Sequence, residues 1–552
     1  MLSNLIKNNL VLLLVLILAA ILRFYQLGQN PPSLDWDETA HGYNAYSILK
    51  TGRDEYGYRL PLYFRSFDDY KPPIYTYLVV PSVAIFGLND FAVRFPSAVL
   101  GVFAVLFTYL MVKELFQNKK IALLAAFFLA ISPWHLQFSR VAFETNSATF
   151  WSVLGTWAFL KGTNSNNLKL TAWMSLTALA FGANLFMYHN ARVFIPIYSL
   201  ALIILFKEKL IASKKYLIVP IIVSLIFIGL LIPIITSISG QLRYRGTTIF
   251  ADVSPQYKAA SLIAQDEQSN QLAIGKLLHN RRFAYIPILV DNYLSHLKPT
   301  YLFLTADMER HHAPGIGLLY LWDLPFILAG IYFLARKNPA SPAGGFDLKA
   351  KIIIFWWFAI APLASSVTWG VPHSLRSEIY LPTYQIFIAI GFYSLYRMFN
   401  KNKAFVTTAV LLLTFNFFFY LHQYYVHMPH DFSEAWLYGR KEAAEFTESI
   451  KDQYDRVIVS TKIDQPHEFW LYYTKYDPTK YLQEGGTVSG GYLEDRNKFD
   501  KYFFKPIDFE KQRHDAKTLF VSTPKELPPG VNVIKQINYL NGEPAIYVFD
   551  GT

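Results

Sequence analysis

The sequence contains no cysteine and few charged residues. Only 16% of its 552 residues are Asp, Glu, Lys or Arg, whereas about a quarter is usual for a soluble protein. The lack of cysteine excludes disulfides, thiolate metal ligands and a cysteine nucleophile. The low charge, together with 53% hydrophobic and 17% aromatic residues, predicts a polytopic membrane protein.

Eleven apolar runs are about as long as a helix needs to cross a bilayer. They lie at residues 10–27, 95–112, 120–134, 147–160, 170–187, 193–206, 216–235, 316–335, 352–369, 379–397 and 403–421. A twelfth run, residues 74–86, is shorter, follows two prolines and contains Pro81. We therefore expect it to form a juxtamembrane helix at the membrane surface.

Basic residues are distributed unequally between the short loops. If residues 74–86 do not span, about 16 of them fall on one side, which also holds Lys7, as in cytoplasmic loops. The short loops of the other side contain Arg140, Arg192 and Arg376. This distribution predicts a cytoplasmic amino terminus. It also explains the net charge of +11, so we expect the lipid bilayer, and no nucleic acid, as a partner.

The chain divides into two predicted parts. Residues 1–425 form the transmembrane domain, with a first external loop at 28–94 and a long external loop at 236–315. In residues 430–552, short apolar runs at 455–460, 518–523 and 545–550 predict strands between helices. The predicted fold class is an all-α polytopic membrane protein with a carboxy-terminal extracytoplasmic α/β domain.

Two polar clusters in the first external loop are candidates for chemistry. The first contains Asp35, Asp37 and Glu38, and the second contains Asp68, Asp69, Tyr70 and Lys71. Asp37 and Glu38 could begin a helix as capping residues. Either could instead act as a general base that deprotonates an acceptor hydroxyl for attack on a sugar carbon. We expect Asp35 to have a structural role.

Three cations on the same predicted face could bind a phosphate leaving group. Lys71, Arg192 and Arg376 could form charge-assisted hydrogen bonds to phosphate oxygens. Alternatively, Lys71 could be an interfacial lysine, and the arginines could bind lipid headgroups.

Other external residues leave alternatives open. Glu144 could be a second catalytic carboxylate or the ion-pair partner of Arg140. His373 lies near Arg376 in another external loop. His311 and His312 are adjacent, and because adjacent histidines seldom serve one metal, we predict no metal ligands.

Five segments carry a resemblance to a known superfamily. They are DWDET (35–39), YKPP (70–73), AVRFPSAVLGV (92–102), SPWHLQFSRVAFETN (132–146) and HSLRSEIYLP (373–382). Together they resemble the GT-C glycosyltransferases, and are similar to bacterial protein O-mannosyltransferases and lipid A aminoarabinose transferases.

The resemblance implies an inverting transfer from a polyprenyl-phosphate-linked sugar to an acceptor lipid, glycan or protein. It matches Asp37 to the base, with Glu38 beside it, Glu144 to a second acidic residue, and Lys71 to a lysine near the donor phosphate. Tyr70 stands where metal-binding relatives carry Glu, so it implies no required cofactor; a divalent metal is conceivable but not expected. We predict this enzyme at the outer face of a prokaryotic cytoplasmic membrane.

Two other functions fit a polytopic membrane protein. A lipid-carrier flippase or transporter would need ionisable residues near the middle of its spans, and these spans contain few of them. A non-catalytic scaffold for cell-envelope assembly is the second alternative.

Overall fold

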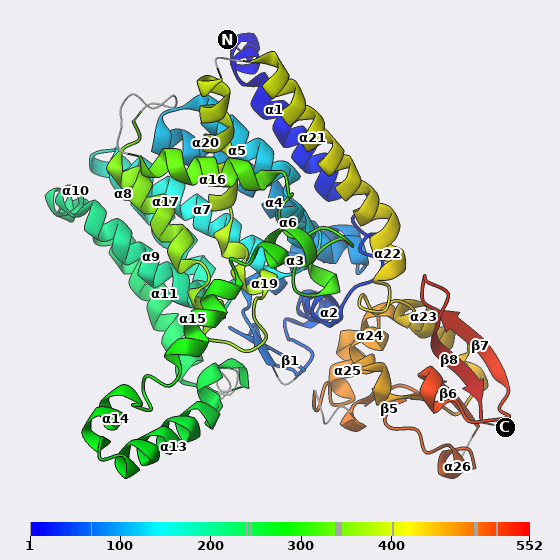
Figure 1. Cartoon of the computed structure of the whole chain (residues 1–552). Coiled ribbons are helices and arrows are strands. Elements are labelled where there is room, and N and C mark those ends of the chain that lie inside the picture. Colours follow the sequence, from blue (N-terminus) through cyan, green and yellow to red (C-terminus); the bar gives the residue numbers. More distant parts are fainter. Residues whose placement is uncertain are drawn as a thin grey trace.

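The computed structural model describes residues 2–67, 69–237, 241, 246–336, 345–399, 402–490, 495–514 and 517–551, with side chains from residue 10 onwards. Asp68 of the second polar cluster and the side chain of Lys7 lie outside the described residues. Figure 1 shows a large helical bundle, a projecting helical hairpin and a separate carboxy-terminal sheet.

Long helices form the bundle. They are α1 (Leu2–Phe24), α4 (Asp90–Phe116), α5 (Lys119–Ile131), α7 (Glu144–Thr163), α8 (Asn167–Leu185), α9 (Ala191–Leu205), α11 (Ile218–Thr236), α16 (Asp323–Ala335), α17 (Leu348–Ile360), α20 (Thr383–Met398) and α21 (Lys403–His422). Helices therefore occupy all eleven predicted runs. The eighth starts seven residues later than expected, at Asp323 rather than at residue 316.

Length and composition alone single out fewer spans than eleven. Four stretches of the described chain satisfy both criteria: α4, α11, residues 348–366 and residues 403–431. The pair α5 and α6 (Pro133–Ser139), bent by 58°, adds a fifth. Helices such as α7 are rich in Ser and Thr and are buried inside the bundle, where several of the polar side chains, such as Ser152 and Thr156, form hydrogen bonds. The chain is a multi-pass membrane protein, and the number eleven remains a prediction.

The first external loop folds against the end of the bundle. It contains α2 (Trp36–Thr51), the short antiparallel pair β1 (Phe64–Ser66) and β2 (Asp69–Lys71), and α3 (Ile74–Phe86). Helix α3 has the 13 residues expected of the surface helix. The long loop after α11 contains α13 (Ser254–Gln268) and α14 (Leu272–Leu278), which form the projecting hairpin of Figure 1, and α15 (Ile286–Ser295).

The carboxy-terminal part contains a six-stranded mixed sheet in the order β4-β5-β3-β6-β8-β7. Strands β3 (Arg456–Val459), β6 (Thr518–Ser522) and β8 (Pro544–Asp550) lie at the three predicted strand positions. The others are β4 (Lys498–Phe499), β5 (Tyr502–Phe504) and β7 (Val533–Asn538). Helices α23 (Arg440–Ile450), α24 (Pro466–Tyr473) and α25 (Pro478–Gln483) complete this part.

Helix α24 packs directly on α2. A side chain at Gly42 of α2 would collide with the ring of Tyr472 in α24. The hydroxyl group of Tyr43 donates a hydrogen bond of 3.2 Å to the carbonyl oxygen of Tyr476. Since α2 also carries the first acidic cluster, the carboxy-terminal part supports the elements that position that cluster.

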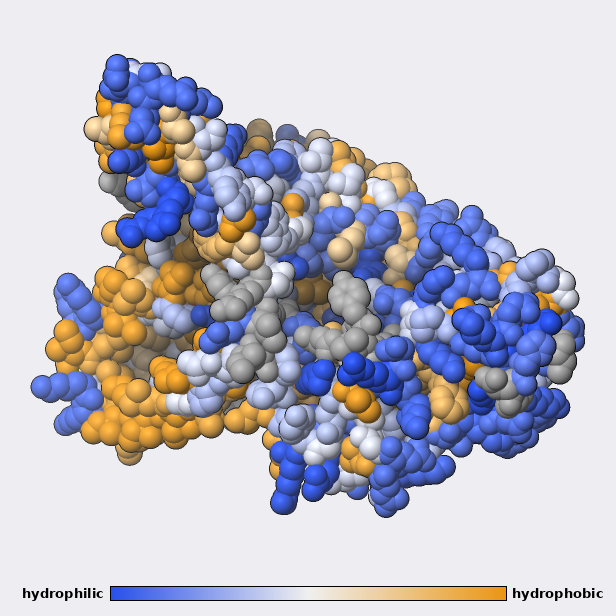
Figure 2. Space-filling view, turned by 90° about the horizontal axis from the view of Figure 1, so that it is seen from below, coloured by the Kyte–Doolittle hydropathy of each residue, from blue (hydrophilic) through white to orange (hydrophobic). Residues whose placement is uncertain are grey.

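Hydrophobic and hydrophilic surfaces occupy different sides of the molecule. Figure 2 shows hydrophobic surface on the side of α9 and α11 and mostly hydrophilic surface over the carboxy-terminal sheet. Several isoleucines and leucines of α11, such as Ile218 and Leu225, are exposed by half or more. Such a surface is stable in contact with lipid, whereas the sheet is suited to water.

Helices α16 and α20 cross where each contains a glycine. A methyl group at Gly391 of α20 would collide with the carbonyl oxygen of Phe326, and one at Gly330 of α16 with that of Phe387. Small residues allow this close approach of membrane helices.

We predict that Gly391→Ala destabilises the protein by about 1–3 kcal/mol, because the added methyl group forces two packed helices apart. The thermal unfolding midpoint in detergent measures this effect. Gly229→Ala on α11 is the matched control, because a methyl group there meets open space. Equal midpoints for the two variants would contradict the predicted packing.

Candidate active site

Helix α2 begins with a capping box. The Oδ1 atom of Asp35 accepts a hydrogen bond from the backbone N–H of Glu38 at 3.0 Å, and Glu38 Oε2 accepts one from the N–H of Asp35 at 3.3 Å. This arrangement satisfies amide groups that the first turn of a helix leaves free. Asp35 thus has the predicted structural role, and the acidic run begins a helix.

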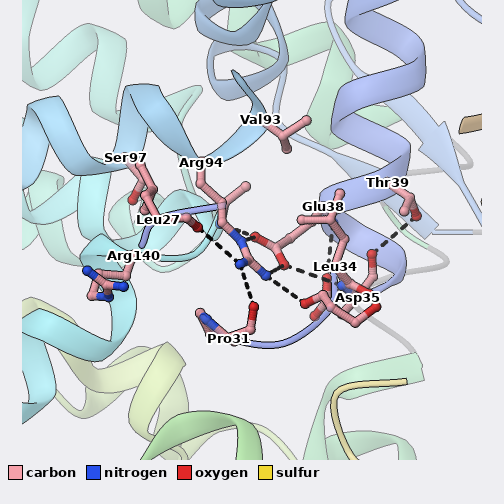
Figure 3. Close-up of polar contacts among 12 residues, drawn as sticks. Leu27, Pro31, Leu34, Asp35, Glu38, Thr39, Val93, Arg94, Ser97 and Arg140 are labelled. Carbon is pink, nitrogen blue, oxygen red and sulfur yellow. Dashed lines mark hydrogen bonds and ion pairs between the residues drawn. The ribbon is translucent and has the colours of Figure 1, made fainter. Parts of the chain in front are cut away.

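Glu38 forms a buried, bidentate ion pair with Arg94 of α4 (Figure 3). Both distances between guanidinium nitrogens and carboxylate oxygens are 2.8 Å. The guanidinium group also donates to the carbonyl oxygens of Pro31 and Ser33, and the N–H of Ala142 donates to Glu38. This ion pair therefore joins the first external loop, α2, α4 and the segment before α7.

Asp37 points in a different direction from Glu38, because neighbouring residues of a helix project about 100° apart. Its Oδ1 atom lies 2.5 Å from the Nζ atom of Lys71, at the end of β2. The Asp37 side chain is 43% exposed and that of Lys71 is 7% exposed. The surrounding protein raises the pKa of Asp37, but the ammonium group of Lys71 outweighs this effect, so the pKa lies below its ordinary value.

Two cavities meet at Lys71. One has a volume of about 480 Å³ and is bordered by tyrosines and by aliphatic residues from the ends of α9 and α11. The other has a volume of about 230 Å³ and contains Asp37. The residues that line both cavities are Lys71, Tyr188, His189 and Arg376. We call the first the apolar cavity and the second the polar cavity.

The predicted phosphate-binding arginines lie beside this junction. Arg192 lines the apolar cavity and donates hydrogen bonds to the carbonyl oxygen of Leu185 and to Nδ1 of His189. Arg376 lines both cavities and donates to Thr368 and to the carbonyl oxygen of Trp369. The three predicted cations are therefore gathered around one place, although they come from three separate segments.

The polar cavity gathers further predicted residues. Asp69, Glu144 and His373 line it with Asp37, whereas Tyr70 lines the apolar cavity. The Oε1 atom of Glu144 lies 3.3 Å from Nε2 of His41. Glu144 is thus near a histidine of α2, and Arg140 is not among the partners found for it in the described structure.

Two predicted site residues have structural surroundings instead. Glu38 is buried in its ion pair, and Arg140 donates to the carbonyl oxygens of Leu22, Tyr25 and Asn30 and to the hydroxyl group of Tyr424. Neither lines the two cavities that the described residues form. Their contacts give them structural roles rather than catalytic or binding ones, because both charges are used to hold backbone segments together.

Arg310 is a residue that the sequence patterns missed. Its guanidinium group lies 3.2 Å from Asp35 and 4.3 Å from the centre of the Trp36 ring, and it lines the polar cavity. Burial and the nearby Asp37 raise the pKa of Asp35 to about 7, although Arg310 opposes this rise. The long loop contains several other basic residues, so no sequence pattern distinguished Arg310 from them.

Two groups of side chains in the described structure could hold a metal ion. The first consists of Asp307, His311 and His373, of which the two histidines line the polar cavity. The second consists of Glu55, His467 and Glu468, which are buried. The first group includes one of the two adjacent histidines. His312 turns elsewhere, with Nδ1 at 2.8 and 3.0 Å from the carbonyl oxygens of Ala313 and Ile316.

The fold belongs to a known class. A crystal structure of ArnT from Cupriavidus metallidurans matches 98% of this chain and 98% of its own length with a TM-score of 0.53 and 12% sequence identity. This likeness is one of fold. The chain therefore has the GT-C fold, as the resemblance of its motifs predicts.

Sequence comparison finds similarity to a known family over part of the chain. Residues 70–232 match the family described as dolichyl-phosphate-mannose-protein mannosyltransferase. An uncharacterized protein of Aquifex aeolicus is 31% identical over 166 residues, 30% of this chain and 32% of that protein. YkcB of Bacillus subtilis, provisionally named a mannosyltransferase, is 26% identical over 225 residues, 39% of this chain and 30% of that protein. The chain thus matches about a third of the length of these curated relatives, and the predicted GT-C resemblance is confirmed.

We predict that Glu38→Gln lowers the free energy of unfolding by about 3–5 kcal/mol, because it leaves the buried charge of Arg94 without its partner. Thermal unfolding in detergent is the measurement. The control is Glu114→Gln, which removes a partly exposed pair with Lys161 and should cost about 0–1 kcal/mol. An equally small effect at Glu38 would show that its ion pair does not hold the loop.

Proposed function

We propose that this protein transfers a sugar from a polyprenyl-phosphate donor to an acceptor hydroxyl, with inversion at the sugar carbon. The observation that carries the proposal is the junction of an apolar and a polar cavity at Lys71 and Arg376. A lipid-linked sugar phosphate has the same order of parts: an apolar chain, a negatively charged phosphate and a polar sugar.

The cavities accommodate these parts in sequence. The lipid chain enters the apolar cavity between α9 and α11, whose outer surfaces are hydrophobic. The phosphate lies at the junction, where Lys71, Arg376 and Arg192 offer positive charge. The ArnT structure with this fold contains undecaprenyl phosphate, which supports a ligand of this class here.

Asp37 is the proposed general base. Its side chain is partly exposed in the polar cavity, and its pKa is held below the ordinary value by Lys71, so it is a carboxylate at neutral pH. It takes the proton of the acceptor hydroxyl as the oxygen attacks the sugar carbon. The bond from that carbon to the phosphate oxygen breaks, and polyprenyl phosphate leaves with the electron pair.

Lys71 has two tasks in this mechanism. In the free protein it pairs with Asp37 at 2.5 Å, and a bound phosphate would compete for the same ammonium group. Donor binding therefore loosens the hold of Lys71 on Asp37 and leaves the carboxylate more basic. Glu144 and Asp69 also line the polar cavity, on the side where hydroxyl groups of the sugar or of the acceptor would bind.

The reaction is placed at the outer face of a prokaryotic cytoplasmic membrane. The distribution of basic residues in the sequence supports this orientation. The acceptor belongs to the lipids, glycans or proteins that present a hydroxyl group there. It would approach from the side of the polar cavity, next to the carboxy-terminal part that packs on α2.

We expect Asp37→Asn to reduce transfer by about 10²–10⁴-fold, the usual contribution of a general base. The measurement is release of polyprenyl phosphate from a defined polyprenyl-phosphate sugar by purified protein. Asp431→Asn, at a surface residue paired with His430, is the control and should keep full activity. Near-normal turnover of Asp37→Asn, with an unchanged unfolding midpoint, would rule out Asp37 as the base.

Lys71→Met should lower transfer by about 10²-fold or more, since a cation at the leaving phosphate is lost. As the pH is lowered, the residual activity of this variant should also begin to fall at a higher pH than the activity of the wild type does. Without Lys71, the pKa of Asp37 rises, so the base becomes protonated sooner as the pH decreases. The pH–rate profile measures this shift. The profile should be unchanged in Lys441→Met, which removes a half-exposed cation near Asp90, and an unshifted profile in Lys71→Met would refute the coupling.

A further inference from the structure

The wall of the polar cavity contains a cluster that the proposed reaction does not use. Asp307 and His311 come from the end of the long external loop, and His373 comes from the loop before α19 (Ser374–Ser377). Oδ2 of Asp307 lies 2.8 Å from Nδ1 of His311 and 3.6 Å from Nδ1 of His373. Two loops more than sixty residues apart in sequence thus bring three metal-ligating side chains together.

The spacing of these atoms suits a small coordinated ion. Ligand atoms about 2.0–2.2 Å from a tetrahedral zinc ion lie about 3.3–3.6 Å apart. The separation between Asp307 and His373 already has this value. The separation between Asp307 and His311 is that of a hydrogen bond and would have to widen by about half an ångström.

The carboxylate is held as a metal ligand usually is, and one imidazole nitrogen is unpaired. Asp307 accepts hydrogen bonds from the N–H of Ser374 at 3.1 Å and from its hydroxyl group at 2.6 Å, which fixes the orientation of the carboxylate. The Nδ1 atom of His373 is buried and has no hydrogen-bond partner among the described residues.

We propose that Asp307, His311 and His373 bind a divalent transition-metal ion of the zinc class. Two imidazoles and one carboxylate form a ligand set of the kind that such ions prefer, and three protein ligands leave a fourth position open. His311 and His373 both line the polar cavity, so the open position is accessible from that cavity. The nearby side chains of Arg310 and Arg376 add no ligands, because a guanidinium group has no acceptor atom.

The ion has a place in the proposed reaction. A bound ion would add positive charge to the polar cavity, which Arg376 also lines. A phosphate or a sugar hydroxyl could then take the fourth position of the ion. This role rests on the proposed function, whereas binding of the ion does not.

The test is zinc binding by the full-length protein, purified in detergent without a histidine tag and stripped with a chelator. We expect one equivalent of Zn²⁺ per chain, measured by calorimetry and by elemental analysis. Substitution of cobalt(II) should give the absorption of a tetrahedral site. His311→Gln and His373→Gln should each weaken zinc binding at least tenfold.

His312→Gln is the matched control, because His312 is adjacent in sequence but turns away from the cluster. It should bind zinc as the wild type does. If His373→Gln fails to fold, Asp307→Asn serves in its place. The absence of binding by the wild type at tens of micromolar Zn²⁺, or equal binding by the ligand variants, would overturn the proposal.

Asp37→Asn separates this proposal from the proposed function. It should lose sugar transfer and retain zinc binding with wild-type affinity. Loss of transfer without any zinc binding would leave the glycosyltransferase proposal standing and refute the metal site. In the wild type, zinc binding without any sugar transfer would support the metal site and refute the glycosyltransferase proposal.

Discussion

The buried ion pair between Glu38 and Arg94 is the constraint on which the site depends. Charges removed from water are tolerated only when they are paired and hydrogen-bonded, and here the guanidinium and carboxylate groups meet in bidentate geometry. The surrounding backbone supplies the remaining partners. Because this pair fixes the rotation of α2, the preceding residue of the helix, Asp37, is directed into the polar cavity.

A second constraint is the boundary between apolar and polar surroundings. Lys71 is almost fully buried, yet it lies where the two cavities meet. A buried ammonium group needs an anion, which is Asp37 in the free protein and, in our proposal, a phosphate when the donor is bound. One cation can thus connect donor binding with the basicity of the catalytic carboxylate, without movement of a helix.

The carboxy-terminal part contributes to the site through packing. Helix α2 lies between the membrane helices and α24, and Gly42 allows the ring of Tyr472 to approach its backbone closely. Glu55, after α2, accepts hydrogen bonds from Asn44 and from Thr487 of the carboxy-terminal part. These contacts hold the end of α2 that the Glu38 ion pair does not reach. The sheet therefore belongs to the support of the site as well as to the surface that faces water.

The sequence by itself determined the membrane character, the helix positions and the three main strands of the sheet, and it named Asp37 and Lys71 as candidate site residues, because hydrophobic length, strand patterning and short motifs are local properties. The sequence matched Asp37 to the base only through the resemblance of its motifs, and it did not reveal that Glu38 is buried in an ion pair with Arg94, because that pair depends on how the helices pack. It also missed Arg310 and the grouping of Asp307 with His373. Those residues are brought together by loops distant in the chain, and their mutual distances arise only when the helices pack.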